Sequence, residues 1–249
     1  MHRFYLPPAS CRGDAIRLDG REAHHALQVM RLKYGELVTV LDGAGHQFLC
    51  TVKDAGRGVV NLSVSLKNFV PAAPCATTLL VAVPKGKLIE GIIQKAVELG
   101  ASRIVPLLTE RVVAQLDDED AAAKRDKWQQ VAVEAIKQCG AAWLPAVAAP
   151  VALEQFLVRG EKFDLALVGS LQNERRLPRE VLREFGVREQ RPPRSVGIWI
   201  GPEGDFTSAE LVGIMNSGAQ PVTFGPLVLR VETAAIYGLS IVNYELQRD

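Results

Sequence analysis

The chain has 249 residues, of which 48% are hydrophobic and 23% are charged, and its formal net charge is +1. This length accommodates one large domain or two modest ones around a substantial core. A net charge so close to neutral disfavours a nucleic-acid binder that is basic throughout, although it permits local basic patches.

The cysteines and the first residues bear on the cellular compartment. Four cysteines without CxxC spacing disfavour a disulfide framework and a zinc site, and they predict reduced thiols. The opening MHRFYLPP lacks the apolar run of a signal peptide, and no run elsewhere approaches the length of a membrane span. We therefore expect a cytoplasmic α/β protein with no membrane association.

Residues 1–70 have a different rhythm from the rest. Short apolar runs at 38–41, 48–52 and 59–64 are separated by glycine-rich turns, which predicts hairpins, and a helical pattern interrupts them at 23–31. We predict a small β-barrel. It contains nine Lys and Arg against six Asp and Glu, so it is either a polyanion-docking module or a domain with ordinary surface charge.

A proline-rich linker at 71–74 precedes a strand–helix–strand pattern. A buried-type strand at 79–83 is followed by a turn at 85–87, a helix at 88–99 closed by Gly100, and a strand at 104–108. This βαβ unit predicts a parallel sheet. Further along, the pattern predicts an acidic surface turn at 117–120, helices at 128–139, 153–158 and 232–246, and a strand at 165–168. The polar, proline-punctuated stretch at 175–194 predicts an exposed helix and loop.

The stretch from 196 to 232 contains two strand ends that each carry a Gly-Pro loop. The run VGIWI stops at GPEGD (201–205), and a second run stops at Gly225-Pro226. Between them, Thr207 and Glu210 are spaced as a capping box for a helix that Gly218 ends. Ligands bind outside the carboxyl ends of strands in open α/β sheets, so we predict that both loops line one pocket.

The usual nucleotide and hydrolase motifs are missing from this region. The sequence has no G-x-x-x-x-G-K-[ST], no G-x-G-x-x-G, no G-x-S-x-G and no cluster with metal-ligand spacing. A pocket of bent backbone and apolar side chains suits an uncharged base with a short polar tail. S-adenosylmethionine, which carries no phosphate, is the cofactor that this pattern favours.

Several motifs together resemble the RsmE-type 16S rRNA uridine-N3 methyltransferases of the SPOUT superfamily. They are IGPEG at 200–204 and FGPLVLRVETA at 224–234, with KG at 85–86 and QKAVELGA at 94–101 upstream. The HRFY start at 2–5 and the His24-His25 pair resemble the family's N-terminal PUA-like barrel. The resemblance covers essentially the whole chain.

This resemblance implies a PUA-like, RNA-binding β-barrel at 1–70 and a trefoil-knotted SPOUT methyltransferase domain at 75–249. It also implies a homodimer that binds 16S rRNA within the small ribosomal subunit. The implied S-adenosylmethionine site comprises Val168, Gly169, Ile200, Gly201, Pro202, Glu203, Gly204, Phe224, Gly225, Leu227 and Leu229.

The reaction implied is an SN2-like methyl transfer to uracil N3, which must lose its proton as it becomes the nucleophile. Arg230 and Glu232 are the catalytic candidates, with Arg230 orienting the uracil or lowering the pKa of its N3–H. The alternative is a salt-bridged helix start, where Glu232 suits the helix dipole. RNA contacts are expected from Arg3, Arg31, Lys85, Lys87 and Arg111. The alternative is that these residues are ordinary surface charges.

The chain departs from the family pattern at four places. Asp205 replaces a usual Gly, Lys137 a usual Glu, Val231 a usual Thr, and residues 140–143 an Arg-rich continuation. Two other functions remain open: a knotted methyltransferase acting on a tRNA base or a ribose 2′-hydroxyl, and an RNA-binding protein without catalytic activity.

Overall fold

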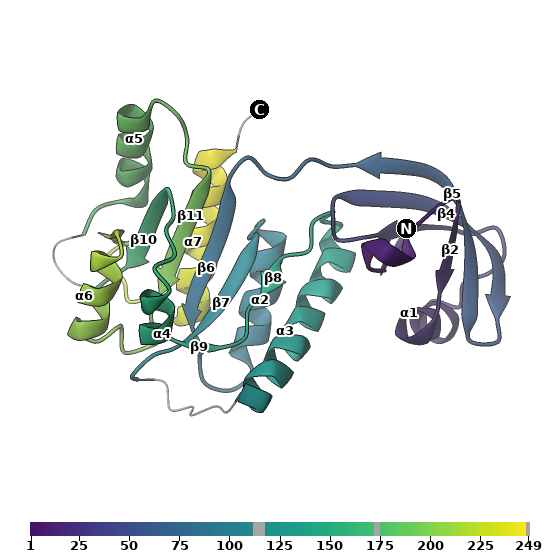
Figure 1. The fold of residues 1–249 in the computed structure, drawn as a ribbon, viewed down its shortest axis with the longest axis horizontal. Coiled ribbons are helices and arrows are strands. Elements are labelled where there is room, and N and C mark those ends of the chain that lie inside the picture. The colour runs from purple at the N-terminus through teal and green to yellow at the C-terminus, as the bar shows by residue number, and fades with distance from the viewer. Residues whose placement is uncertain (112–117, 172–174, 248–249) are drawn as a thin grey trace. The chain divides into compact units, whose positions relative to one another are not determined.

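A computed structural model describes residues 1–111, 118–171 and 175–247 of the chain (Figure 1). The chain divides into two compact units. The first comprises Met1–Ala72 together with Val133–Leu144, and the second comprises Ala73–Ala132 together with Pro145–Asp249. The division after Ala72 falls within the expected proline-rich linker. The return of residues 133–144 to the first unit has no counterpart in the sequence pattern.

The first unit is built on a five-stranded sheet with the order β1-β3-β4-β5-β2. Its two predicted hairpins are confirmed, since β3, β4 and β5 pair antiparallel in succession. Strand β1 instead runs parallel to β3. The strands are β1 (His2–Tyr5), β2 (Ala15–Leu18), β3 (Leu37–Leu41), β4 (His46–Gly56) and β5 (Val59–Phe69).

Alternating residues of all five strands fill one hydrophobic core, to which Phe4, Ile16, Val40, Phe48 and Leu62 contribute. Successive side chains of a strand point to opposite faces of the sheet, so alternating residues of each strand can reach this core. The predicted helical segment is present as α1 (Gly20–His24), which continues as a π-helical turn (His25–Val29). It ends before the predicted boundary, because Arg31 has a positive φ of 53°.

The second unit contains a seven-stranded sheet with the order β12-β10-β11-β6-β7-β8, in which β9 pairs with β7. Every pairing among its described strands is parallel, as the βαβ pattern predicts. The strands are β6 (Ala76–Ala82), β7 (Arg103–Leu108), β8 (Ala146–Val147), β9 (Val151–Ala152), β10 (Leu165–Gly169), β11 (Ser195–Ile200) and β12 (Ala219–Val222).

Helices cover this sheet and bury its apolar strands, as parallel sheets require (Figure 1). Helix α6 (Ser208–Asn216) and α4 (Leu153–Val158) pack together over one cluster of core residues, while α7 (Val231–Leu246) packs with α2 (Leu88–Glu98) and with α5 (Pro178–Glu189). The predicted capping box is confirmed at α6, where Thr207 Oγ1 accepts from Glu210 N–H at 3.3 Å and Glu210 accepts from Thr207 N–H at 2.8 Å.

Two expectations differ from the structure. Residues 118–120 begin helix α3 (Asp118–Cys139) instead of forming a turn, and acidic residues suit a helix start because of the helix dipole; Asp117 lies outside the described residues. The second strand of the 196–232 stretch ends at Val222, so Phe224 belongs to the following loop.

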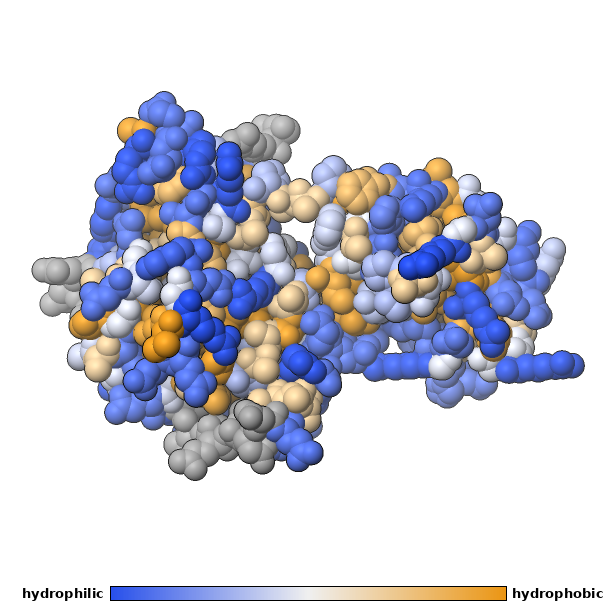
Figure 2. Space-filling model, viewed as in Figure 1, coloured by the Kyte–Doolittle hydropathy of each residue, from blue (hydrophilic) through white to orange (hydrophobic). Residues whose placement is uncertain are grey.

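The surface seen in Figure 2 is mostly hydrophilic, with apolar residues scattered over it. No helix in the described part of the chain combines the length and apolar character that crossing a lipid bilayer requires.

Candidate functional site

A cleft lies at the carboxyl ends of β10, β11 and β12, where three loops meet. The pairing of Val168 with Trp199 and of Gly169 with Val222 brings these three strand ends to one edge of the sheet. The prediction that the two Gly-Pro loops line one pocket is therefore confirmed, and a third loop after β10 joins them. The lining residues are Gly169, Ser170, Leu171, Arg175, Ile200, Gly201, Pro202, Glu203, Asp205, Thr223, Phe224, Gly225, Leu227, Val228, Leu229, Val231 and Ala234.

Phe224 holds the loop after β12 against the rest of the site. A Cβ added at Gly169 would lie 2.7 Å from the Phe224 ring, and one added at Gly238 of α7 would lie 3.0 Å from it. The ring also meets Tyr237 edge-on, with 6.0 Å between centroids. Two glycines from different elements thus leave the space that this aromatic side chain occupies.

Two further glycines of the cleft loops, Gly225 and Gly201, have different structural reasons. Gly225 has a φ of +117°, which L side chains rarely adopt, although a Cβ there would meet nothing within 4 Å. At Gly201, an added Cβ would lie 3.2 Å from the backbone nitrogen of Phe206. Gly225 therefore allows a backbone conformation that other residues rarely adopt, and Gly201 allows two chain segments to approach closely.

Asp205 takes the place of the glycine that the resembling family usually has. Its φ is +64°, in the left-handed region that aspartate tolerates better than most residues. The carboxylate accepts from its neighbour Phe206 N–H at 2.9 Å and from Leu171 N–H at 3.2 Å. The loop keeps a glycine-like backbone, and its carboxylate links it to the loop after β10.

The chemistry of the lining suits a nucleoside with a compact polar tail. Apolar side chains such as Leu229 and Val231 line the cleft together with the glycine loops, and lysine is missing from the described lining residues. Among the described lining residues, Arg175, Glu203 and Asp205 are the charged ones. Arg175 is held in place, because its Nη1 donates to the Ser170 carbonyl at 3.1 Å. These donors and apolar walls fit S-adenosylmethionine better than a phosphate-bearing nucleotide.

Nine of the eleven residues expected at the cofactor site line this cleft. The two others are Val168, which is fully buried in β10, and Gly204, which packs against the Arg111 side chain. Residues of the third loop, among them Ser170 and Arg175, were missed. Their only signal in the sequence is their position directly after a predicted strand end.

The two catalytic candidates lie at the start of α7, next to the cleft in sequence. Arg230 is the exposed N-cap residue and Glu232 is in the first turn. Among the described residues, the lining set includes their neighbours Leu229 and Val231 but neither of the two charged side chains. Glu232 occupies a position where the helix dipole favours a carboxylate, and the catalytic role of both residues stays a prediction.

The residues expected to contact RNA occupy three different settings. Lys85, Lys87 and Arg111 line a second cleft of the same unit, whereas Arg31 is an exposed residue of the first unit. Arg3 has a structural partner. Its Nη1 donates to the carbonyls of Gln138 at 2.9 Å and Lys137 at 3.3 Å, at the C-terminal end of α3.

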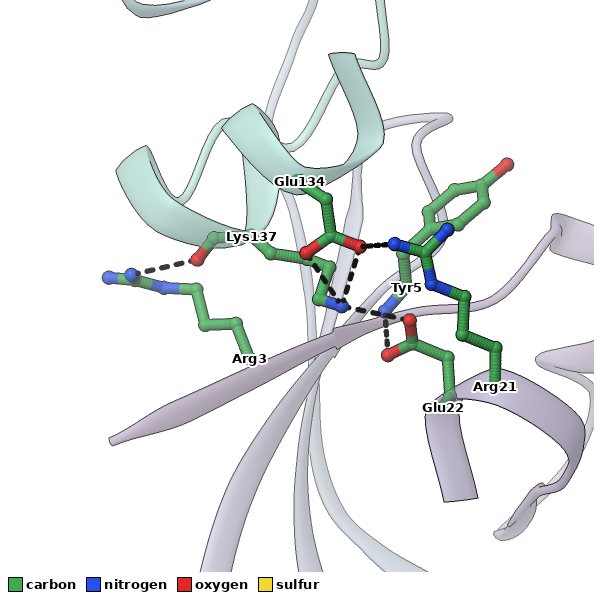
Figure 3. Close-up of polar contacts among 6 residues, drawn as sticks. All are labelled: Arg3, Tyr5, Arg21, Glu22, Glu134 and Lys137. Atoms are coloured by element: carbon green, nitrogen blue, oxygen red, sulfur yellow. Dashed lines mark hydrogen bonds and ion pairs between the residues drawn. The ribbon is translucent and has the colours of Figure 1, made fainter. Parts of the chain in front are cut away.

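Lys137, which departs from the family's usual Glu, is a buried residue of the first unit (Figure 3). Its Nζ lies 2.8 Å from Glu22 Oε1 and 3.2 Å from Glu134 Oε2. Glu134 in turn pairs with Arg21 at 3.2 Å. The lysine at this position therefore takes part in an ion-pair network between α1 and the end of α3.

Comparison with known proteins connects this geometry to a family. A family model described as an RNA methyltransferase domain matches residues 71–243, and one described as an RNA methyltransferase PUA domain matches residues 18–64. A Bacillus subtilis relative named ribosomal RNA small subunit methyltransferase E is 30% identical, over 92% of this chain and 90% of its own length. A Synechocystis relative of the same name is 32% identical, over 99% and 78% respectively.

Two similar structures have been solved with the cofactor. A methyltransferase from Legionella pneumophila in complex with bound SAM is 32% identical, with a TM-score of 0.85 and coverage of 97% of this chain and 96% of that one. A ribosomal RNA small subunit methyltransferase E from Neisseria gonorrhoeae, bound to S-adenosyl methionine, is 25% identical, with a TM-score of 0.85 and coverage of 98% and 97%.

Proposed function

The chain belongs to the RNA methyltransferase family that includes the ribosomal RNA small subunit methyltransferases E, and from this premise we propose that it methylates N3 of a uridine in 16S rRNA. It is an S-adenosylmethionine-dependent enzyme of this family. The observation that carries the proposal is the three-loop cleft, because the motifs that resemble the family form its walls.

In the proposed cofactor site, the residues of this chain bind the cofactor and orient it. S-adenosylmethionine, when bound, supplies an electrophilic methyl group on a sulfonium. The backbone of the loops at 201–203 and 223–229 offers hydrogen-bonding groups to the adenine edge, and Leu227 and Leu229 offer apolar contact. The Asp205 carboxylate lies among the lining residues, where it favours a cationic ligand over a neutral one. These assignments, with Val168 and Gly204 as supporting residues, are our proposal.

The substrate side of the reaction requires a uracil anion, because N3 is protonated near neutral pH. We place Arg230 beside the uracil, where its positive charge stabilises the developing anion as the N3 proton leaves. Glu232, in the first turn of α7, orients Arg230 or accepts that proton. Support comes from their position immediately after the cleft-lining Leu229.

We further propose that the enzyme works as a cytoplasmic homodimer with a trefoil knot in its second unit and that its substrate is in the small ribosomal subunit. The first unit would dock the RNA, as its PUA-type match suggests. Apolar side chains support self-association. Leu227 and Val228 beside the cleft, with Tyr237 and Tyr244 one heptad apart on α7, are exposed.

Two measurements test the activity. Calorimetry should detect S-adenosylmethionine binding, and mass mapping of 16S rRNA from a deletion strain should lack one N3-methyluridine that the purified enzyme restores. Arg230→Ala should retain cofactor binding and lose methyl transfer. Full activity of that variant would remove Arg230 from the mechanism, and an unchanged methylation pattern in the deletion strain would refute the substrate assignment.

The same measurements separate the alternatives. Methylation of a tRNA base or a ribose hydroxyl would appear as a different missing modification in the deletion strain. An RNA-binding protein without activity would show no heat with S-adenosylmethionine.

A further inference from the structure

We propose that the second cleft of this unit binds the phosphodiester backbone of the substrate RNA, with Lys124 and Lys127 of α3 as binding residues. This inference rests on the proposed function and extends it to a defined surface. The cleft is formed by the loop between β6 and α2, by Arg111 after β7, and by Lys124, Lys127 and Trp128 of α3.

Cations from three segments converge on this cleft. Lys85 and Lys87 come from the turn before α2, Arg111 follows β7, and Lys124 and Lys127 lie three residues apart on α3. Residues three apart in a helix share one face. Against these five positive charges, the lining residues that the structure describes include two carboxylates, Glu90 and Glu203. A concave surface with one dominant sign of charge concentrates its field and attracts a polyanion.

Most of these cations are available to a ligand. Among the residues that the structure describes, Lys127 is the one of the five with an ion pair, formed with Glu90 at 2.7 Å. Lys85, Lys87 and Arg111 are exposed. The cleft's floor is apolar, because Trp128 and Ile89 are buried beneath it. Long lysine side chains over an apolar floor keep their charged ends toward solvent.

The cleft is linked to the cofactor site through the loop after β11. Glu203 lines both clefts. Arg111 donates from Nη1 to the Asp205 carbonyl at 3.2 Å and packs on Gly204, where an added Cβ would lie 3.2 Å from it. A strand bound along the cations therefore lies next to the loop that lines the cofactor cleft, as a substrate for methyl transfer must.

The arrangement suits a polymer rather than a small phosphate compound. Compact phosphate sites use a glycine-rich loop with several backbone N–H groups, and Lys85-Gly86-Lys87 lacks the preceding glycines. Lysines and an arginine spread over three segments instead neutralise successive phosphates. Binding of that kind releases counterions, so its affinity falls with salt concentration.

The test compares Lys124→Ala/Lys127→Ala with the wild type, using unmethylated 16S rRNA from the deletion strain as the probe. We expect at least tenfold weaker binding of this RNA and a log–log salt slope that is smaller by about 1 to 2, because each lost phosphate contact contributes about 0.7 to 0.9. KM for the RNA should rise while kcat at saturating RNA is kept. The S-adenosylmethionine affinity and thermal midpoint should stay unchanged.

The matched control is Arg159→Ala/Lys162→Ala, which removes two positive charges from exposed residues after α4, outside the cleft. It should leave the salt slope and KM unchanged. A second variant, Lys124→Glu/Lys127→Glu, should weaken RNA binding further. If the wild type methylates 16S rRNA and both cleft variants keep its RNA affinity and salt slope, the phosphodiester site is wrong. If the wild type fails to methylate 16S rRNA, the proposed function itself has failed.

Discussion

Asp205 shows how one side chain can take over a glycine position and add a contact. Its backbone has a positive φ of 64°, and its carboxylate accepts hydrogen bonds from Phe206 and from Leu171 of another cleft loop. An L residue in this conformation costs about 1 to 2 kcal/mol. The two hydrogen bonds to a charged acceptor offset that cost.

We therefore expect Asp205→Ala to weaken cofactor binding more than Asp205→Asn does. Alanine keeps the backbone strain and loses both acceptors, whereas asparagine tolerates positive φ and keeps a side-chain oxygen. The alanine variant should bind S-adenosylmethionine about tenfold more weakly, which corresponds to about 1.4 kcal/mol, and the asparagine variant should be intermediate. Isothermal calorimetry measures both, and equal affinities of the two variants would contradict this role.

The four thiols differ in their surroundings, and burial raises the pKa of Cys11 to about 11, of Cys50 to about 12 and of Cys75 to about 11. Cys139 at the end of α3 is exposed. The thiolate is the nucleophile, so a thiol whose pKa lies far above the solution pH reacts slowly.

Iodoacetamide at about pH 8 should therefore modify Cys139 first in the folded protein. The three other thiols should react much more slowly in the folded protein, because burial and their raised pKa values leave little thiolate at this pH. Peptide mass spectrometry over a time course measures the order, with Cys139→Ser and a sample in concentrated guanidinium chloride as controls. Modification of Cys75 as fast as Cys139 would show that burial does not protect the Cys75 thiol.

At the scale of elements, the C-terminal end of α3 is held in the first unit by polar contacts (Figure 3). Lys137 and Glu22 are both largely buried and lie 2.8 Å apart, while Glu22 also accepts from Tyr5 N–H at 3.3 Å. Arg3 binds the terminal carbonyls of the helix. Removal of one partner would leave a buried charge without its counter-ion.

Lys137→Ala should lower the free energy of unfolding by about 3 kcal/mol, because Glu22 stays buried and uncompensated. Lys137→Glu, which restores the family's usual residue, should lower the free energy of unfolding further, since it places a third carboxylate beside Glu22 and Glu134. The exposed pair Lys95–Glu98 provides the control. Lys95→Ala should cost under about 1 kcal/mol. Urea denaturation measures all three variants, and equal costs for Lys137→Ala and Lys95→Ala would show that the buried pair contributes no more than a surface one.

At the scale of the whole molecule, the proposed homodimer is tied to exposed apolar residues of the loop after β12 and of helix α7. Tyr244 is 77% exposed and Leu227 is 74% exposed. Tyr237, one heptad before Tyr244, contacts Phe224 of the same loop system. Exposed apolar residues that gather at one place mark association surfaces.

We expect the wild type to sediment as a dimer at micromolar concentration and Tyr244→Glu to weaken the dimer at least tenfold, because a charge would be buried in the interface. Val187→Glu on α5, at another exposed apolar position, should leave the dimer intact. Sedimentation equilibrium measures all three proteins. A monomeric wild type would refute the homodimer, and equal effects of both substitutions would place the interface elsewhere.

Local patterns in the sequence predicted most of the secondary structure and the centre of the cofactor site. The βαβ rhythm, the Thr207–Glu210 capping box and the Gly-Pro loops depend on residues close together in the chain, so their spacing carries the information. The absence of phosphate-binding motifs favoured S-adenosylmethionine, the family motifs supplied the residues expected to bind it, and nine of those eleven residues line the cleft.

Only the tertiary structure showed which distant segments come together. The loop after β10 joins the cleft because β10 pairs with both β11 and β12, and Lys124 and Lys127 face Lys85 and Arg111 because α3 packs beside the turn before α2. Lys137 finds Glu22 across 115 positions of sequence. No local spacing encodes such contacts, because they follow from strand order and helix packing, which are settled by burial of the whole core.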